Sequence, residues 1–186
     1  MKIEDNLHWL LSYYRSSEIS GALFFGQLAR GLKPSAIQCD MTRHFADEAQ
    51  HARYWTQCLE QLGVEPLKLD KAYQDQYIAA TGMPGNLMEI LALTLVFENR
   101  VVTQYNLHSC GDELPAVVHD TLETIMTDEQ WHLEWIRGAL LEMEDEYGRD
   151  HIQQTLKRYT EADREVYANT IQEHRQRIDH LTLAQR

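Results

Sequence analysis

Apolar residues recur at three- and four-residue steps along most of this 186-residue chain, which is the period of helices that bury one face. Only four prolines occur, and with neighbouring glycines they separate the periodic stretches from one another. The pattern predicts an all-α fold with five long helices, over residues 3–30, 35–63, 86–110, 112–148 and 150–183.

The lengths of the connections predict how these helices pack. Short loops join the first helix to the second and the third to the fourth, whereas residues 63–85 form a longer link with a short amphipathic segment at about 69–80. Two antiparallel hairpins joined by one long crossover make a four-helix bundle. Gly31 is expected as a left-handed C-terminal cap, Asn86 and Asp112 as N-terminal caps, and Pro115 in a first turn.

A chain of this length supports one well-filled core, so residues 1–186 are predicted to form a single domain. Residues 1–148 would form the bundle, and residues 149–186 a long C-terminal helical extension. This extension is expected to pack on the bundle or on a second copy of the chain, because it carries an apolar stripe at helical spacing. The stripe consists of Ile152, Leu156, Tyr159, Val166, Ile171 and Ile178.

One five-residue pattern occurs once in each half of the chain, as DEAQH at 47–51 and as DEQWH at 128–132. In a helix, residues three apart share a face, so Glu48 lies beside His51 and Glu129 beside His132. If both pairs point into the bundle, the other two helices must supply polar partners, because unpaired buried polar groups are costly.

Each of those two helices offers one glutamate within an apolar run: Glu18 in SEISGALFFG and Glu98 in EILALTLVFENRVVTQY. Their positions match, since Glu18 precedes Glu48 by 30 residues and Glu98 precedes Glu129 by 31. We therefore expect the two hairpins to present their carboxylates at the same depth.

The set contains four carboxylates and two imidazoles, a combination that di-iron carboxylate bundles use to bind two metal ions. Four carboxylates balance the charge of two divalent ions, whereas without metal they would repel one another and mostly protonate. Hard oxygen donors with one imidazole per ion favour iron or manganese, and zinc could also occupy the site. The predicted metal ligands are Glu18, Glu48, His51, Glu98, Glu129 and His132.

Residues close to these six allow two interpretations each. Asp47 and Asp128 could each orient the metal-bound histidine of the opposite hairpin, or be exposed helix residues. His44 is expected to be solvated rather than part of the site. Four aromatic residues could carry electrons near the metals or simply fill the core, namely Tyr14, Trp55, Tyr105 and Trp135.

Charge and composition exclude several classes of function. With a net charge of -12 and no cluster of Lys and Arg, the chain is a poor nucleic-acid partner. Three cysteines, without a C-x-x-C pair, indicate reduced thiols rather than disulfides or a thiolate metal centre. An acidic N-terminus and the lack of a long apolar run predict no signal peptide and no membrane association, so a cytoplasmic location is expected.

The stretches DEAQHARYW…LEQLGVEPL and DEQWHLEWI…LLEMEDEYG resemble the second and fourth helices of bacterioferritin, and the six ligand positions resemble the ferritin-like superfamily, which includes rubrerythrins. The resemblance implies a ferritin-like bundle with two iron ions bridged by Glu48 and Glu129. Bacterioferritin has a haem-binding Met where this chain has Ala49, so no haem is expected. Rubrerythrins have an additional Glu where this chain has Val101, and usually a C-x-x-C module.

The function that the resemblance implies is a di-iron (or Mn/Fe) oxidoreductase that reacts with dioxygen or hydrogen peroxide. Electrons would come from an external donor, and the protein would be a monomer or a homodimer. One alternative is an iron-binding or storage protein with ferroxidase activity, which would need a closed cage. A further alternative is a di-iron hydroxylase acting on a tRNA or another organic substrate.

Overall fold

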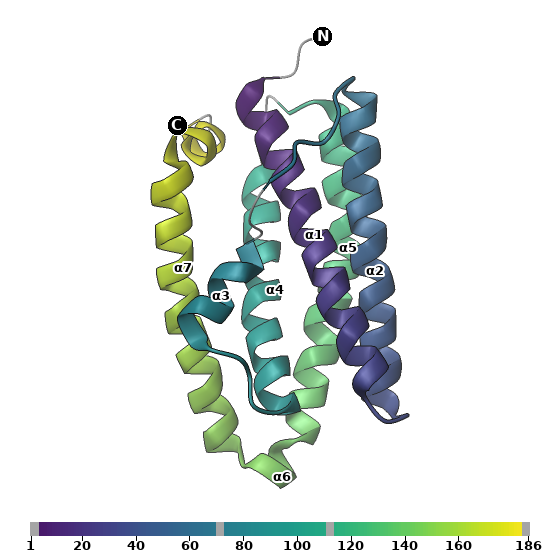
Figure 1. Cartoon of the computed structure of the whole chain (residues 1–186), viewed down its shortest axis with the longest axis vertical. Coiled ribbons are helices and arrows are strands. Elements are labelled where there is room, and N and C mark those ends of the chain that lie inside the picture. The colour runs from purple at the N-terminus through teal and green to yellow at the C-terminus, as the bar shows by residue number, and fades with distance from the viewer. Residues whose placement is uncertain (1–3, 70–72, 111–113, 184–186) are drawn as a thin grey trace.

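The computed structural model describes residues 4–69, 73–110 and 114–183, and in those ranges it contains helices but no strand (Figure 1). The all-α prediction is therefore confirmed. No helix in the described part of the chain combines the length and the apolar composition that a membrane span requires. The helices are α1 (Asp5–Gly31), α2 (Ala36–Gln61), α3 (Tyr73–Thr81), α4 (Leu87–Ser109), α5 (Ala116–Glu142), α6 (Glu144–Tyr147) and α7 (Arg149–Leu183).

Two helices begin where the sequence predicted, because a polar side chain satisfies a free backbone N–H group in the first turn. The Ser35 hydroxyl accepts a hydrogen bond from the backbone N–H of Gln38 at the start of α2. The Asn86 side chain accepts one from Glu89 at the start of α4, at 2.9 Å. Both caps fix the point at which the chain turns into the bundle.

Three predicted boundaries differ from the structure. Gly31 is the last residue of α1 and not a left-handed cap: the chain continues in an extended conformation from Leu32, because Pro34 disfavours helix just before it. The fourth predicted helix ends at Glu142, and α6 forms a separate turn before Gly148, whose positive φ redirects the chain into α7. Pro115 precedes the first turn of α5, and Asp112 lies outside the described residues.

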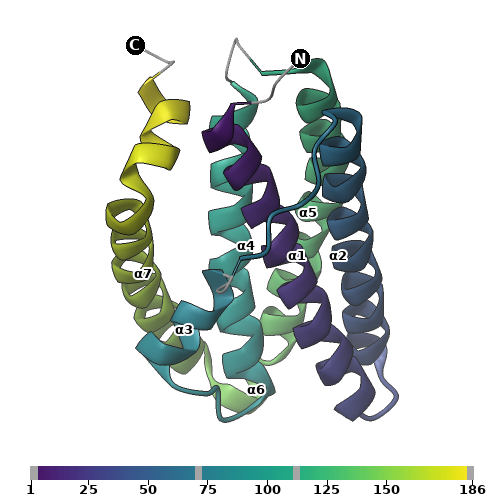
Figure 2. The same ribbon diagram turned by 45° about the horizontal axis from the view of Figure 1, so that its top comes forward.

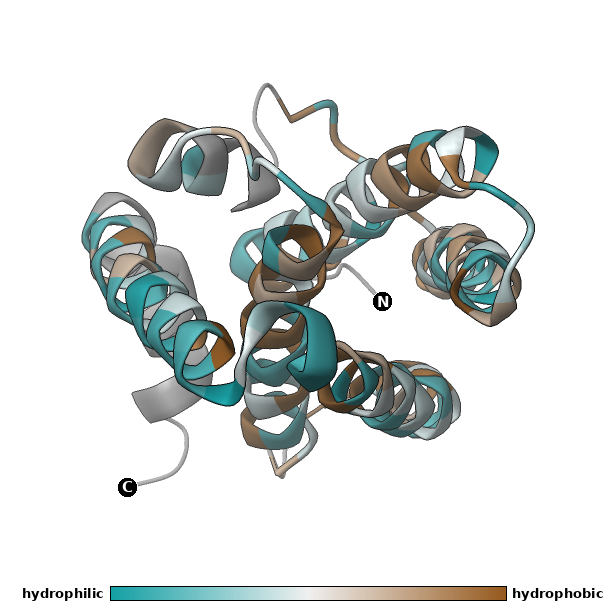
Figure 3. Ribbon diagram, turned by 90° about the horizontal axis from the view of Figure 1, so that it is seen from below, coloured by the Kyte–Doolittle hydropathy of each residue, from teal (hydrophilic) through white to brown (hydrophobic). Residues whose placement is uncertain are grey.

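The four long helices α1, α2, α4 and α5 pack as two hairpins, α1 with α2 and α4 with α5, and α2 also contacts α5 (Figures 1 and 2). The long connection after α2 carries α3 across α1 towards α7. Seen nearly end-on, hydrophobic positions concentrate towards the middle of the assembly (Figure 3). Residues 91–96 of α4 are all buried, so this part of the helix is covered on every side.

The C-terminal helix α7 packs against α4 and also contacts α3 and α1. It buries Ile152, Tyr159 and Val166, three residues of the predicted stripe, whereas the side chains of Ile171 and Ile178 lie outside the described ones. Of the two predicted surfaces, α7 therefore uses the bundle. As a result α4, which carries one of the candidate ligands, lies between the other bundle helices and α7.

Candidate metal centre

All six predicted ligands lie in the interior, where side chains from four helices meet. Each is at most 5% exposed, and His51, Glu129 and His132 are completely buried. Each of them lies on a helix face among apolar neighbours, which directs it inward. The bundle must therefore compensate for the lost hydration of four carboxylates and two imidazoles. The contributing residues are Glu18 from α1, Glu48 and His51 from α2, Glu98 from α4, and Glu129 and His132 from α5.

One half of this cluster surrounds His51. Its Nδ1 atom lies 3.6 Å from Glu18 Oε2 and 3.3 Å from Glu129 Oε1. Together with Glu48, these residues offer one ligand atom each within 4.8 Å of one another, close enough to bind a single metal ion.

The other half surrounds His132, whose Nδ1 atom lies 3.3 Å from Glu129 Oε2 and 3.8 Å from Glu48 Oε1. A second group of possible ligands, again within 4.8 Å, consists of His44, Glu48, Glu98 and His132. Glu48 belongs to both groups, and Glu129 contacts both His51 and His132. The two halves are therefore adjacent and share carboxylates.

Several atoms that face this centre have no hydrogen-bond partner among the described residues. They include His51 Nδ1, Glu98 Oε1 and Glu129 Oε1, each fully shielded from solvent. Buried oxygen and nitrogen atoms are rarely left without a partner, because each costs about 1–3 kcal/mol. Metal ions placed between the donors would satisfy these atoms, so the residues present fit a di-metal site.

Both aspartates that precede the E-x-x-H pairs face the histidine of the opposite hairpin. His51 Nε2 lies 3.3 Å from Asp128 Oδ2, and His132 Nε2 lies 3.5 Å from Asp47 Oδ2. A carboxylate on Nε2 keeps the proton on that nitrogen and leaves the Nδ1 lone pair facing the centre. The first contact is a hydrogen bond, so the structure supports the orienting interpretation for Asp128. The second is proximity alone, so an orienting role of Asp47 stays a prediction.

His44 was expected to be solvated, and that expectation is wrong: the side chain is completely buried. Its Nε2 atom lies 3.2 Å from Glu98 Oε1 and 3.4 Å from Glu48 Oε1. The ring stacks between Phe25, at 3.9 Å between centroids, and His132, at 3.6 Å. The helical spacing could have predicted this burial, because His44 is one turn before Glu48 on the same face of α2.

Proton affinities in the cluster are strongly perturbed. Burial, reinforced by the neighbouring carboxylates, raises the pKa of Glu48 and Glu98 well above the usual range. Burial disfavours the charged form of Glu129 too, but His132 and His51 outweigh it and hold its pKa below the usual range. Burial likewise opposes protonation of both histidines, yet the surrounding carboxylates raise the pKa of His51 to about 12 and that of His132 to about 9. The metal-free cluster thus retains protons that metal ions would have to displace.

An aromatic cluster borders the centre on the side of Glu18. The Tyr105 hydroxyl donates a hydrogen bond to Glu18 Oε1 and accepts one from Trp55 Nε1 at 3.2 Å. Tyr14 packs edge-on against Tyr105, with 4.9 Å between ring centroids. Tyr105 therefore contacts one candidate ligand, and Tyr14 and Trp55 contact Tyr105. An electron-carrying role for these residues stays a prediction.

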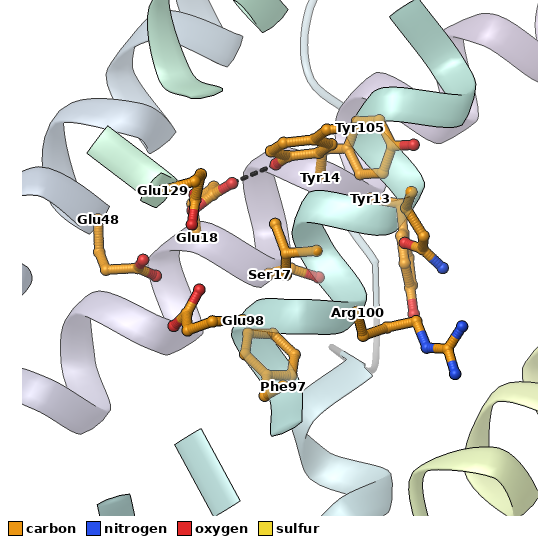
Figure 4. A pocket seen from close by; sticks show the side chains of 12 residues that line it. Tyr13, Tyr14, Ser17, Glu18, Glu48, Phe97, Glu98, Arg100, Tyr105 and Glu129 are labelled. Carbon is orange, nitrogen blue, oxygen red and sulfur yellow. Dashed lines mark hydrogen bonds between the residues drawn. The ribbon is translucent and has the colours of Figure 1, made fainter. Parts of the chain in front are cut away.

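A small cavity reaches the carboxylates between α1 and α4. It has a volume of about 20 Å³, and Figure 4 shows Glu18, Glu48, Glu98 and Glu129 pointing towards one another at its inner end. Arg100 lies on the opposite side of the view, towards α7. This volume is about that of one water molecule.

Comparisons with protein-family models, with curated proteins and with solved structures give no match.

Proposed function

We propose that this chain is a ferritin-like bundle protein that binds two metal ions, best iron, and uses them to react with dioxygen or hydrogen peroxide. One observation carries the proposal: two groups of buried carboxylates and imidazoles share Glu48 and present atoms that lack hydrogen-bond partners among the described residues. Without metal ions, the cluster has to retain protons on its carboxylates and imidazoles to limit this buried charge, which a purely structural role would not require.

The contacts divide the six ligands between two positions. Glu18 and His51 would hold one ion, and Glu98 and His132 the other. Glu48 and Glu129, which lie between the halves, would contact both. Each ion would then have one imidazole and several carboxylate oxygens, a set that suits iron or manganese and that zinc can also occupy.

Iron ions, when bound, supply the electrons that reduce dioxygen or peroxide. The chain itself excludes water, because all six ligands are buried. Asp128 binds the outer ring nitrogen of His51, and Asp47 lies 3.5 Å from that of His132, so that both inner nitrogens would be available to hold the ions. Tyr105 holds one oxygen of Glu18 and so fixes the orientation of that carboxylate.

The small volume of the cavity favours a small reactant over an organic substrate. The volume of about 20 Å³ is close to that of one water molecule and far below that of a drug-sized ligand pocket, so a reactant of a few atoms would need far less rearrangement than an organic substrate. A nucleotide of a tRNA would require the bundle to open, and the net charge of -12 opposes RNA binding as well. These two observations make the hydroxylase alternative the weaker one.

Turnover would need an external electron donor such as a reductase or a ferredoxin. The described residues contain no cluster of thiolates that could serve as an internal carrier, and the cysteines are free thiols. Whether the electrons instead come from incoming ferrous iron distinguishes an oxidoreductase from a storage protein.

The decisive experiment adds ferrous iron aerobically to metal-free protein at increasing ratios and counts the irons retained per chain. Saturation at about two, the capacity of one di-metal site, is the expected result. Uptake far beyond that would support storage in a cage, and no retention would overturn the proposal.

A matched pair of variants on α5 shows whether the retained iron occupies this centre. Glu129→Gln removes a ligand, whereas Glu134→Gln changes an exposed glutamate on the same helix. We expect the first variant to lose at least one of the two irons and the second to retain both. Circular dichroism of both variants verifies that the helices are intact.

A further inference from the structure

His44 lies close enough to Glu48, Glu98 and His132 to pass for a third histidine ligand. The geometry points to a different role: we infer that Trp135 fixes His44 as a neutral hydrogen-bond donor, which holds the carboxylates of Glu98 and Glu48 and does not bind metal. The inference rests on the proposed di-metal site and defines which of the three histidines at the centre are ligands.

The three histidines differ in what touches the ring nitrogen that faces away from the centre. For His51 and His132 this partner is a carboxylate, Asp128 or Asp47, which can only accept a hydrogen bond when ionised. Their outer Nε2 atoms therefore carry the proton, and their inner Nδ1 atoms present a lone pair. This is the tautomer that a metal ion requires.

For His44 the outer partner is an indole. Trp135 Nε1 donates to His44 Nδ1 at 3.2 Å, and an indole N–H is a donor with no acceptor capacity. His44 Nδ1 must hold its lone pair towards Trp135, so the single proton of the neutral ring is on Nε2. The same contact excludes the doubly protonated ring, which would place two N–H groups against each other.

That proton points into the centre. The nearest acceptors are Glu98 Oε1 at 3.2 Å and Glu48 Oε1 at 3.4 Å. Neither contact is a complete hydrogen bond here, so these carboxylates are the groups that the Nε2 proton would bind. Stacking between Phe25 and His132 holds the ring plane, with interplanar angles of 28° and 18°. His44 would thus act as a positioning residue: its Nε2 proton would bind one carboxylate oxygen and leave the other carboxylate oxygens for the metal ions.

Nitrogen NMR of the zinc-loaded protein tests the inference directly, because histidine side-chain correlations separate a protonated nitrogen from one that holds a lone pair or a metal. We expect His44 to show a proton on Nε2 and none on Nδ1, and His51 and His132 to show a metal on Nδ1. A metal-bound Nε2 of His44 would overturn the inference. The wild-type protein suffices for this measurement.

Variants supply a second readout that does not depend on activity. His44→Phe keeps the stacking but removes the donor, and we expect two zinc ions per chain at about 10- to 100-fold lower affinity. His44→Gln, whose amide N–H can donate, should recover most of that loss. A fall to one zinc ion in both variants would identify His44 as a ligand.

Trp135→Phe removes the indole donor while keeping an aromatic ring. We expect the proton of His44 to leave Nε2 in a substantial part of the molecules, which the same spectra detect. Trp131→Phe is the matched control, because this indole lies four residues earlier on α5 and covers Arg43. An unchanged His44 spectrum in Trp135→Phe would contradict the inference.

The inference and the proposed function fail separately. Protein that binds no zinc would end the di-metal proposal. The hydrogen bond between Trp135 and His44 involves no metal, so NMR also determines the tautomer of His44 in protein that binds no zinc. A proton on Nδ1 in that protein would overturn the inference.

Discussion

His51 Nε2 lies 3.3 Å from Asp128 Oδ2, so a carboxylate of one helical hairpin orients a histidine of the other. Asp47 faces His132 in the reciprocal arrangement, at 3.5 Å. Each hairpin therefore contributes both a histidine and the group that fixes the histidine of its partner. The two hairpins must therefore pack together before either histidine lies next to its carboxylate.

Replacing Asp128 by Asn should weaken metal binding while the fold is kept. The amide cannot hold the Nε2 proton of His51 as a carboxylate does, so the ring loses its preference for presenting Nδ1 to the centre. We expect about 10- to 100-fold lower zinc affinity, the usual cost of losing such a partner, in competition with a chelator. Asp120→Asn, at an exposed position of α5, is the control, and equal affinities in the two variants would refute the role of Asp128.

Gly21 tests the close packing around the shared carboxylate. A Cβ atom at this position would overlap Glu48 Oε2 and lie 3.1 Å from Glu48 Cδ, so Gly21→Ala must displace the end of this side chain. The substitution favours helix formation by about 0.5–1 kcal/mol, and a flexible carboxylate can move, so the metal-free protein should not be less stable. Metal binding should nevertheless weaken, because Glu48 belongs to both halves of the centre.

The measurement combines thermal unfolding of metal-free protein with zinc binding. Gly138→Ala in α5 is the matched control, because a Cβ atom there meets nothing within 4 Å. We expect Gly138→Ala to leave zinc binding unchanged. Wild-type affinity in Gly21→Ala would show that Glu48 does not need its present position.

The sequence predicted the helices and the six clustered residues because both depend on local spacing. An E-x-x-H pair places Glu48 and His51 on one face whatever the surrounding fold. The role of His44 could not be predicted in the same way, since it depends on Trp135, which is 91 residues away on another helix. Helix ends are harder to predict, because one or two residues at each end can adopt either conformation. Gly31 was expected as a left-handed cap, but Pro34 favours an extended chain just after it.

Below neutral pH, His108 should make stability depend on pH independently of the metal centre. Burial lowers its pKa from 6.5 to about 4, and no described residue hydrogen bonds to either ring nitrogen. The unfolded chain therefore binds a proton below pH 6.5 that the native protein does not bind until about pH 4. The free energy of unfolding should fall over this interval, by about 3 kcal/mol from this residue alone.

Urea unfolding of metal-free protein at several pH values measures this contribution. His108→Leu should remove it, so that the stability of the variant declines less steeply between pH 6.5 and 4 than that of the wild type. The exposed His119 on α5 provides the control substitution. If the free energy of unfolding depended on pH in the same way in wild type and in His108→Leu, His108 would not be the source of this pH dependence.

Asp163 should contribute strongly to the attachment of α7, because it joins three helices at a position only 4% exposed. Its Oδ2 atom accepts a hydrogen bond from Arg100 Nε on α4 at 3.1 Å, and its Oδ1 atom accepts one from the Tyr77 hydroxyl on α3. Asp163→Asn keeps the size of the side chain but removes the negative charge that faces the Arg100 guanidinium. Breaking a buried ion pair from one side costs about 3–5 kcal/mol, and partial exposure of Arg100 places the expected loss at about 3 kcal/mol.

Glu161→Gln is the control on the same helix, since its ion pair with Lys157 is exposed and should contribute less than about 1 kcal/mol. Urea unfolding compares the two variants, and limited proteolysis shows whether α7 is cleaved before the bundle. We expect Asp163→Asn to be cleaved first within α7, because this helix loses its main polar attachment to α4. Equal stability and equal cleavage in both variants would mean that apolar contacts of Ile152, Tyr159 and Val166 are sufficient to hold α7 in place.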